Sequence, residues 1–482
     1  MFSTPCLRTL VLLLGSLWLA ACGDQYHTLP FPTPAQHDLV VLIPPGPLTY
    51  VADEGGKVGG LEHDIVEAFA QDLGVAARFV VAPANEIPAR LARGEAHFAA
   101  AWYSPEKGSP LPTTPPFMLS HDVIVQHEAS LPIDDLSELE NRSVHVLAGS
   151  RQAATLRAAQ AGVPGLRIVE ERYSDAFALL AAVADRRVEV AAVDSAHLAI
   201  ALQFVPSLQA TLEFDEEEPV AWLFGERFNP ELRVRADAFI QRIQRDGTLA
   251  RIEDRYFGHV RRLKAADIAK FVEQMETALP RLRQHFVTAQ RQSGLDWRLV
   301  AAVAYQESRW DANAVSPTGV RGIMMLTEET ADRLGVSNRL DARESIVAGA
   351  RYLDFLRQLL PAAVSEPDRT WLALAAYNIG PGHFNAARNL ARQLKADPDS
   401  WYEMKRILPL LAQPKYYEKL KAGRARGGEA VILVENIRSY YDILSRHESA
   451  FQPPHGGPNA MMGMSASLAG APGRSPGLKP GR

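Results

Sequence analysis

Short apolar runs alternate with amphipathic segments along the first half of the chain. Runs bounded by Gly and polar residues predict a buried strand at 39–43 and further strands at 77–81, 144–147 and 188–193. Between the first two, apolar residues recur at helical spacing over 65–73, which predicts an amphipathic helix. Such alternation is typical of an α/β domain, and we expect one over residues 38–262.

Helical spacing replaces the strand pattern in the second half of the chain. Turn sequences rich in Gly and Pro, at 316–319 and 379–382, separate the predicted helices. The sequence therefore predicts a second, mainly α-helical domain over residues 268–450. Beyond it, residues 451–482 are dense in Gly, Pro, Ala and Ser and have no hydrophobic face, which predicts a disordered tail.

The N-terminus has the pattern of a bacterial lipoprotein signal. Arg8 precedes an apolar run over 10–21, which is shorter than the ~20 residues that span a bilayer but typical of a signal-peptide core. The run ends in Leu-Ala-Ala-Cys at 19–22, which resembles the lipobox, in which Cys22 becomes the first residue of the mature chain and carries lipid. The alternative is an ordinary signal peptide cleaved near Ala21.

Under the lipobox interpretation, residues 1–21 are the signal peptide, and residues 22–37, rich in Pro, Thr and Gln, tether the lipid to the first domain. Gly23 rather than Asp follows the cysteine, which favours the outer over the inner membrane in Gram-negative sorting. We therefore expect a lipid-anchored protein on the periplasmic face of the outer membrane.

Composition narrows the classes of function. The chain has 51 Lys and Arg against 56 Asp and Glu, a formal net charge of -5, so we expect no nucleic-acid partner. Both cysteines, Cys6 and Cys22, lie near the N-terminus, so the folded body holds neither a disulfide nor a cysteine metal site. No His-Glu-x-x-His pattern occurs in the sequence, and we predict no metal and no cofactor.

One glutamate lies on the apolar face of a predicted helix. Asp296 caps a helix that begins at Trp297. On one face of it fall Val300, Val303 and Glu307. Apolar surroundings destabilise an ionised carboxylate, so its pKa rises and it can donate a proton at neutral pH, as glycosidic bond cleavage requires. The alternative is a structural glutamate held in an ion pair.

The residues around this glutamate form a series of motifs. They are Glu-Ser at 307–308, Ser-Pro-Thr-Gly at 316–319, Gly-Ile-Met-Met-Leu at 322–326 and Ala-Tyr-Asn at 376–378. In order and approximate spacing they resemble the motifs of the goose-lysozyme-like lytic transglycosylases, over about residues 268–445. The resemblance implies a small helical, lysozyme-like fold with a sugar-binding cleft.

The same resemblance implies roles for individual residues. Glu307 is the catalytic acid, and Ser308 orients the substrate or the acid. Tyr377 and Asn378 line the cleft beside the scissile bond. Met325 stands where the family usually has Gln, which removes a polar contact and points to the membrane-bound F-type subgroup.

A degenerate form of the family's last motif, Asn-Ile-Arg-Ser-Tyr, follows at 436–440. In the family a tyrosine there faces the catalytic acid, so Tyr440 is a candidate substrate-binding residue. Alternatively it is a core aromatic on a helix, because Tyr441 competes for the same register.

The family's chemistry needs one carboxyl group where most glycoside hydrolases use two. The implied substrate is the glycan strand of peptidoglycan. Glu307 donates a proton to the oxygen that links N-acetylmuramic acid to N-acetylglucosamine, and then takes one from the C6 hydroxyl of the muramic sugar. The product ends in a 1,6-anhydro sugar without consuming water, so the implied activity is that of a lyase in cell-wall remodelling and turnover.

The first domain carries a second set of motifs. Gly-Leu-Glu-His-Asp-Ile at 60–65, Asp-Gly-Thr-Leu at 246–249 and Arg-Tyr-Phe-Gly at 255–258 resemble the bilobal solute-binding proteins of amino-acid transporters, over about residues 38–258. The ligand contacts that this resemblance implies are Lys107, Ser150 and Asp194.

The expected ligand of this domain follows from one difference between its sequence and the family's motif. Lys107 stands where the family has an Arg that clamps the ligand's α-carboxylate, and Lys cannot form that bidentate fork. A simple amino acid is therefore a poor ligand, and we expect a muropeptide or stem peptide as effector. Alternatively the domain is a spacer or a protein-binding module without a small ligand.

Both domains in this order behind a lipobox resemble the F-type membrane-bound lytic transglycosylases. Two hypotheses remain: an active transglycosylase, or a non-enzymatic solute or peptidoglycan receptor with an inactive lysozyme-like domain. The pairs Glu307-Ser308 and Tyr377-Asn378 favour the enzyme, because an inactive relative would be free to lose the acid.

Overall fold

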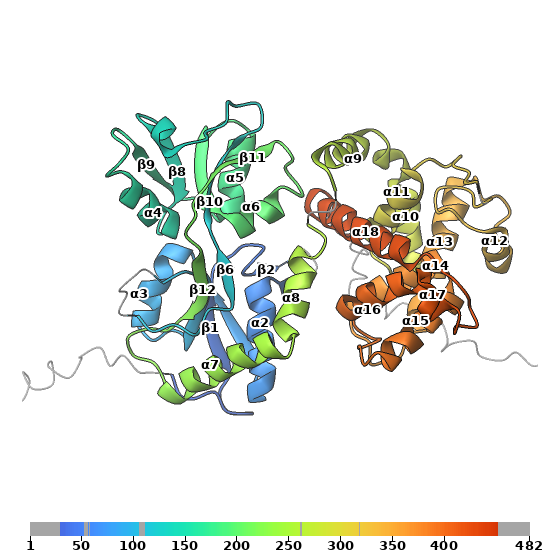
Figure 1. Ribbon diagram of the computed structural model, residues 1–482, viewed down its shortest axis with the longest axis horizontal. Coiled ribbons are helices and arrows are strands. Elements are labelled where there is room, and N and C mark those ends of the chain that lie inside the picture. The colour runs from blue at the N-terminus through green and yellow to red at the C-terminus, as the bar shows by residue number, and fades with distance from the viewer. Residues whose placement is uncertain are drawn as a thin grey trace, which may run out of the picture.

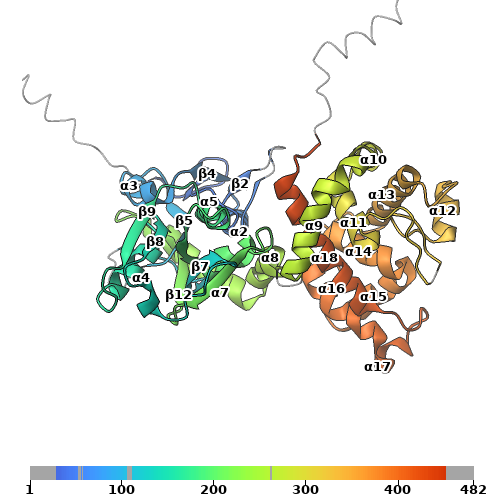
Figure 2. The same cartoon turned by 90° about the horizontal axis from the view of Figure 1, so that it is seen from above.

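The computed structural model describes residues 29–52, 56, 58–105, 111–260, 263–317 and 319–451. They form an α/β domain followed by a helical domain, which lie next to each other (Figures 1 and 2). The predicted fold class is thus confirmed. The expected signal peptide, Cys22 and Lys107 lie outside the described residues, as does the chain after residue 451.

The first lobe of the α/β domain is built on a five-stranded sheet of order β4-β1-β5-β12-β6. The strands are β1 (Leu39–Ile43), β4 (Ala77–Val81), β5 (Phe98–Tyr103), β6 (Met118–Ser120) and β12 (Glu218–Leu223). β1 is parallel to β4 and β5, and β12 is antiparallel to its two neighbours. Before α2 lies a hairpin of β2 (Val51–Ala52) and β3 (Val58–Gly59).

Helices cover both faces of this sheet because its strands are apolar on both sides. On one face pack α2 (Leu61–Leu73), α7 (Pro230–Arg245) and α8 (Thr248–Phe257). On the other pack η1 (Ala84–Glu86) and α3 (Ile87–Ala92).

The second lobe has its own five-stranded sheet, of order β11-β7-β10-β8-β9. The strands are β7 (Asp122–His127), β8 (Ser143–Leu147), β9 (Arg167–Glu171), β10 (Val190–Asp194) and β11 (Leu208–Glu213). Its helices are η2 (Leu136–Leu139), α4 (Arg151–Ala159), α5 (Ala176–Ala184) and α6 (Ser195–Ala201). Two connections, β6 to β7 and β11 to β12, join the lobes, an arrangement that permits hinge closure.

The end of the predicted tether belongs to the folded domain. Leu29 and Phe31 pack against the core of the first lobe, and Nε2 of His97 donates a hydrogen bond to the Pro30 carbonyl at 2.9 Å. A Pro-rich composition indicated a linker, but the apolar side chains among the prolines gain contacts by packing on β1 and its neighbours. The folded domain therefore begins before residue 38.

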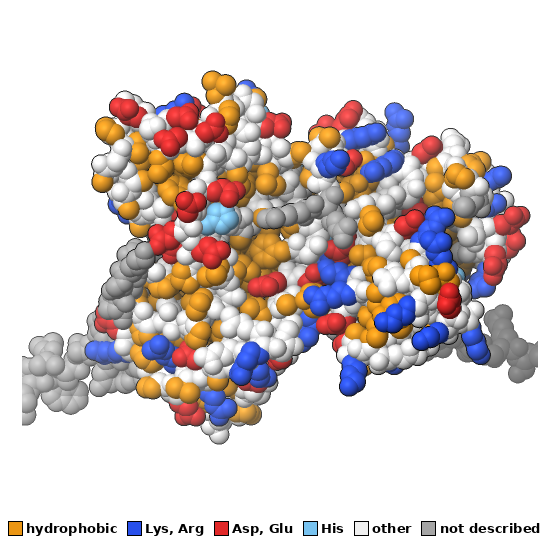
Figure 3. All heavy atoms as spheres, in the orientation of Figure 1, with side chains coloured by type: hydrophobic (Ala, Val, Ile, Leu, Met, Phe, Trp, Pro, Cys, Tyr) orange, Lys and Arg blue, Asp and Glu red, His pale blue; other side chains and the backbone are white. Residues whose placement is uncertain are grey.

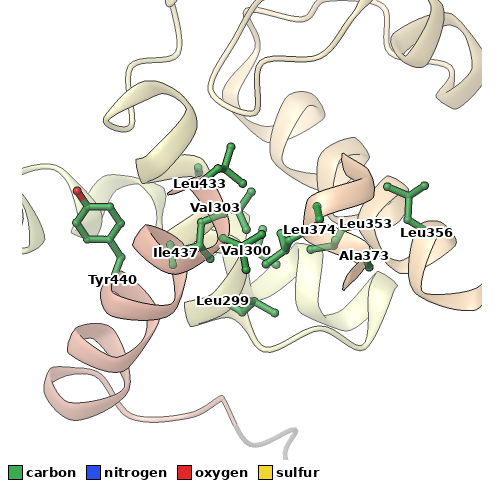
Figure 4. Close-up of a cluster of buried hydrophobic side chains, with 14 of the residues drawn as sticks. Leu299, Val300, Val303, Leu353, Leu356, Ala373, Leu374, Leu433, Ile437 and Tyr440 are labelled. Atoms are coloured by element: carbon green, nitrogen blue, oxygen red, sulfur yellow. The ribbon is translucent and has the colours of Figure 1, made fainter. Parts of the chain in front are cut away.

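The second domain is helical throughout, apart from turns and isolated bridges. Its helices are α9 (Ala265–Thr277), α10 (Leu279–Ser293), α11 (Trp297–Ser308), α12 (Glu328–Leu334), α13 (Ala342–Gln358), α14 (Asp368–Ile379), α15 (Pro381–Gln393), α16 (Trp401–Ile407), η3 (Leu408–Ala412), α17 (Pro414–Tyr417) and α18 (Gly427–His447). Figure 4 shows part of the core, where Val300 and Val303 of α11 lie near Ile437 of α18. Among the helices of the described residues, none is both long and apolar enough to span a bilayer.

Helix α18 also contacts both lobes of the first domain. Arg438 donates to the Asp254 carbonyl of α8 at 2.7 Å, and His259 Nε2 lies 2.5 Å from an Asp442 carboxylate oxygen. One turn on, the Arg446 guanidinium lies 4.0 Å from the ring centroid of Phe204, in the second lobe. A change in the angle between the lobes therefore has to change at least one of these contacts.

Candidate functional site

The catalytic candidate Glu307 lies in the last turn of α11. The side chain of Asp296 accepts a hydrogen bond from the Arg298 amide at 2.9 Å, which caps the helix as predicted. Arg309 ends the helix in the left-handed conformation, with φ of 57°. The helix is otherwise buried from Trp297 onwards, so its end holds Glu307 at the border of the core.

The surroundings of Glu307 favour the protonated carboxyl group. Burial raises its pKa from the usual 4.5 to about 7. In the described part of the chain no cation pairs with it. Its neighbour Arg309 points elsewhere, because its guanidinium lies over the Tyr305 ring at 4.8 Å and donates to the Tyr440 hydroxyl at 2.7 Å. A group poised in this way can donate a proton near pH 7 and accept one afterwards.

Ser308 holds the loop that faces α11. Its Oγ donates to the Ile323 carbonyl at 2.9 Å and lies 3.1 Å from that of Ala304. These backbone contacts fix the 322–326 loop against α11, and a role of Ser308 in orienting the substrate or the acid stays a prediction.

Two glycines allow this loop to pack closely. Gly322 has φ of +80°, and a Cβ there would lie 1.8 Å from the Arg339 carbonyl oxygen. A Cβ on Gly349 of α13 would lie 2.7 Å from Cε of Met324. Because neither position has room for a side chain, the loop lies directly on α13 and presents Met325, which is partly buried, with φ of 48°.

Tyr377 completes the group from the end of α14. Its hydroxyl donates to the Met324 carbonyl at 2.8 Å. Burial and then the nearby charge of Glu307 raise the pKa of Tyr377. Asn378, the next residue, is exposed. The structure therefore places Tyr377 and the loop with Met325 next to the end of α11 that carries Glu307, and their roles toward the substrate stay predictions.

Tyr440 does not belong to this group. It is 1% exposed, and its ring centroid lies 4.6 Å from that of Phe271 and 4.8 Å from that of Tyr305 (Figure 4 places it on α18). A side chain so enclosed has no surface to offer a sugar, so the core alternative describes it and the substrate contact does not. Tyr441 turns the other way and donates to Asp296 at 3.1 Å.

A second candidate site is a cavity of about 210 Å³ between the lobes of the first domain. Its walls include side chains from both lobes: Thr49, Trp102, Ser104, Glu218, Ser150, Arg151, Asp194 and His197. On the face shown in Figure 3, acidic side chains gather where the two lobes meet. Two of the predicted contacts, Ser150 and Asp194, therefore lie in one cleft.

Ser150 and Asp194 differ in how much hydrogen-bonding capacity is free for a ligand. Ser150 Oγ is buried and has no hydrogen-bond partner among the described residues. Asp194 caps α6, accepting from the amides of Ala196 and His197 at 3.1 Å each, and also pairs with the His197 ring. Burial opposes ionisation, but the charge and hydrogen bonds of His197 outweigh it and lower the pKa of Asp194. Its carboxylate is thus largely committed to its own helix.

The sequence did not point to Arg151, which follows Ser150 at the start of α4. Arg151 lies 2.5 Å from an Asp122 oxygen in its own lobe and 3.6 Å from a Glu218 oxygen in the other lobe. The neighbouring Ser150 was the only local signal, because both partners come from distant segments. No group of three or more His, Cys, Asp or Glu side chains in the described residues could hold a metal ion.

Comparisons with known proteins divide the chain in the same way. The family model described as Transglycosylase SLT domain matches residues 284–399, and that of the bacterial extracellular solute-binding proteins, family 3, matches residues 39–259. An ancestral arginine-binding protein bound to arginine is 20% identical, with a TM-score of 0.41, over 45% of this chain and 96% of that one.

Relatives also match both domains together. The membrane-bound lytic murein transglycosylase F of Methylobacillus flagellatus is 41% identical over 93% of this chain and 96% of that protein. That of Nitrosospira multiformis is 40% identical over 93% of each chain, and that of Pseudomonas syringae pv. syringae is 36% identical over 92% of this chain and 90% of its own. This chain therefore belongs to the membrane-bound lytic murein transglycosylase F family.

Proposed function

We propose that Glu307 is the single acid and base with which this lytic transglycosylase cleaves the glycan strand of peptidoglycan. The observation that carries the proposal is the burial of Glu307, which has no cationic partner among the described residues and whose pKa burial raises to about 7. Near neutral pH the group is then divided between its acid and base forms, as a residue that must act in both steps requires.

The reaction follows from this one carboxyl group. Protonated Glu307 donates its proton to the oxygen between N-acetylmuramic acid and N-acetylglucosamine. The bond between this oxygen and the muramic anomeric carbon breaks, assisted by the substrate's acetamido group at that carbon. The carboxylate then takes the proton of the C6 hydroxyl, whose oxygen bonds to the anomeric carbon. Glu307 is then protonated again, and the muramic end has become a 1,6-anhydro sugar.

The product distinguishes this reaction from hydrolysis. Purified protein should convert glycan strands into fragments whose muramic ends have the anhydro mass, and digestion in ¹⁸O-water should leave no label on them. Mass spectrometry of the fragments measures both. Reducing ends that carry ¹⁸O would mean that the protein is a hydrolase, and no cleavage would favour the receptor hypothesis.

We also propose that lipid on Cys22 anchors the protein to the outer membrane, a proposal that rests on the lipobox in the sequence. Cys22→Ala should remain active on soluble glycan strands but move from the membrane fraction to the soluble fraction, because it cannot carry the lipid. Fractionation followed by immunoblotting measures the change. Cys6→Ala is the matched control and should stay with the membrane, and continued membrane association of Cys22→Ala would contradict the anchor.

A third proposal concerns the interlobe cleft. We propose that it binds a muropeptide or stem-peptide fragment of the cell wall and thereby changes the activity of the catalytic domain. The cleft has walls from both lobes, an unpartnered Ser150 hydroxyl and a two-connection hinge. Fragments released by the enzyme carry amines and carboxylates that the polar groups of the cleft could bind. We further propose that the first domain ends near residue 262 and that the catalytic domain covers residues 268–450, as the sequence predicts.

A further inference from the structure

An aromatic pair beside the catalytic residues is not used in the reaction described above. On α13, Tyr352 is partly buried, and Phe355, three residues later, is 42% exposed. Their rings are nearly parallel, with centroids 6.3 Å apart and an interplanar angle of 20°. The pair therefore offers aromatic surface to solvent, with the polar residues Arg351 and Asp354 beside it on the same helix.

The pair continues directly from the catalytic group. The Tyr352 ring centroid lies 5.6 Å from that of Tyr377, whose own hydroxyl holds the 322–326 loop. Ser308, the residue after Glu307, donates to the Ile323 carbonyl of the same loop, so Tyr377 and the end of α11 hold adjacent carbonyl groups. Glu307, Tyr377, Tyr352 and Phe355 therefore form a row that leads from the catalytic acid to the surface.

The chemistry of this row fits a sugar ring. The face of a pyranose presents C–H bonds, which pack against the flat, electron-rich face of an aromatic ring. Its edges carry hydroxyl groups, and the Tyr352 hydroxyl has no hydrogen bond to any of the described residues. Glu329 and Arg333 of α12 act electrostatically on that hydroxyl, so polar groups are also within reach of a bound sugar.

We propose that Tyr352 and Phe355 form an aromatic platform that binds one sugar ring of the glycan strand next to the bond that is cleaved. The proposal rests on Glu307 being the catalytic acid. The platform takes no part in proton transfer, so its contribution is made equally in the bound substrate and in the transition state. Its loss therefore raises KM and leaves kcat nearly unchanged.

The test compares full-length variants on isolated glycan strands. Tyr352→Ala and Phe355→Ala should each raise KM about tenfold, with kcat within about threefold of the wild type. Tyr352→Phe should raise KM far less than Tyr352→Ala, because it keeps the ring and loses only the hydroxyl. Leu359→Ala is the control, since Leu359 is an exposed apolar residue on the same helix that lies outside the platform, and its KM should not change.

Binding without turnover gives a second measurement. In a Glu307→Gln background, cosedimentation with insoluble peptidoglycan should fall for Tyr352→Ala and fall far less for Tyr352→Phe, with unfolding temperatures as a check on folding. Unchanged KM and unchanged binding in both alanine variants would overturn the platform. So would a fall in kcat alone, because it would mean that Tyr352 only supports Tyr377. An active Glu307→Gln protein would refute the catalytic proposal instead, and the KM comparison does not depend on it.

Discussion

Glu307→Gln should fold like the wild-type protein and lose at least about a thousandfold of its activity on glycan strands. The amide has nearly the shape of the carboxyl group, so the loop that Ser308 and Tyr377 hold should keep its place. It has no proton to donate to the leaving oxygen, and Arg309 is held by aromatic rings and cannot replace it. Release of anhydro-ended fragments is the measurement. Asp311→Asn is the control, because it makes the same carboxyl-to-amide change at an exposed residue nearby, and it should keep wild-type activity. Wild-type-like release of fragments by Glu307→Gln would show that Glu307 is not the catalytic acid.

The same variant has a second, pH-dependent consequence. Burial raises the pKa of Glu307 to about 7 in the folded protein, above its value in the unfolded chain. The stability that the protonated group contributes is therefore present at low pH and lost as the pH rises through about 7. Gln is uncharged throughout, so the unfolding temperature of Glu307→Gln should exceed that of the wild type at pH 8 and approach it at pH 5. Wild-type activity should fall above pH 7, as the donor ionises.

Local patterns were sufficient where a segment's own residues decide its structure. The predicted strands at 39–43 and 77–81 are β1 and β4, which pair in parallel. The apolar run of β1 is fully buried, whereas β4 lies at the edge of the sheet and is only partly buried. The catalytic helix begins at Trp297 with Asp296 as its cap, since the cap and the apolar face are both encoded within a few residues.

The start of α2 shows where such patterns fail. The helix begins at Leu61, four residues before the predicted start, and it buries Glu62 and His63. Glu62 accepts a hydrogen bond from the Trp102 amide at 2.6 Å. Burial raises the pKa of Glu62 to about 8, so its side chain is mainly uncharged near pH 7. The polar residues at the start of α2 indicated a loop. Burial of Glu62 is possible because the amide of Trp102, near the end of β5, donates a hydrogen bond to it.

The interlobe cleft and the core around Tyr440 are formed by contacts between residues that lie far apart in the sequence. Arg151 meets Asp122 of one sheet and Glu218 of another, and no spacing in the sequence encodes that meeting. On α18 one step along the helix turns a side chain by about 100°. That step separates Tyr440 in the aromatic core from Tyr441 at Asp296, and only the packing of α18 on α11 decides between them.

The same helix gives the effector proposal a physical route. α18 contacts α8 of the first lobe through Arg438 and the second lobe through Arg446, which lies 4.0 Å from the Phe204 ring and 4.9 Å from the Phe177 ring. Its Tyr440 accepts a hydrogen bond from Arg309, two residues beyond the catalytic acid. A ligand that closes the lobes would displace α18 or break its contact with the second lobe, and a displacement of α18 would reach the end of α11 through Tyr440 and Arg309.

Arg446→Ala should uncouple the cleft from the active site. For the wild type we expect a soluble stem-peptide fragment to bind the full-length chain and to change substrate affinity about 5- to 150-fold, the range of ordinary allosteric coupling. In the variant the fragment should still bind, as calorimetry would show, but its effect on glycan cleavage should shrink towards none. The coupling is reciprocal, so bound glycan in the Glu307→Gln protein should change the fragment's affinity by the same factor.

A suitable control removes the same kind of contact without crossing between domains. Arg291 lies 4.8 Å from the Phe451 ring within the catalytic domain, so Arg291→Ala should keep the full response to the fragment. A response that survives in Arg446→Ala but is lost in Arg291→Ala would show that the coupling does not pass through the second lobe. If no fragment binds, and deletion of residues 38–258 leaves the rate unchanged, the first domain is a spacer. A ligand with equal affinity for the open and closed lobes could not alter the enzyme at all, so binding and response must be measured together.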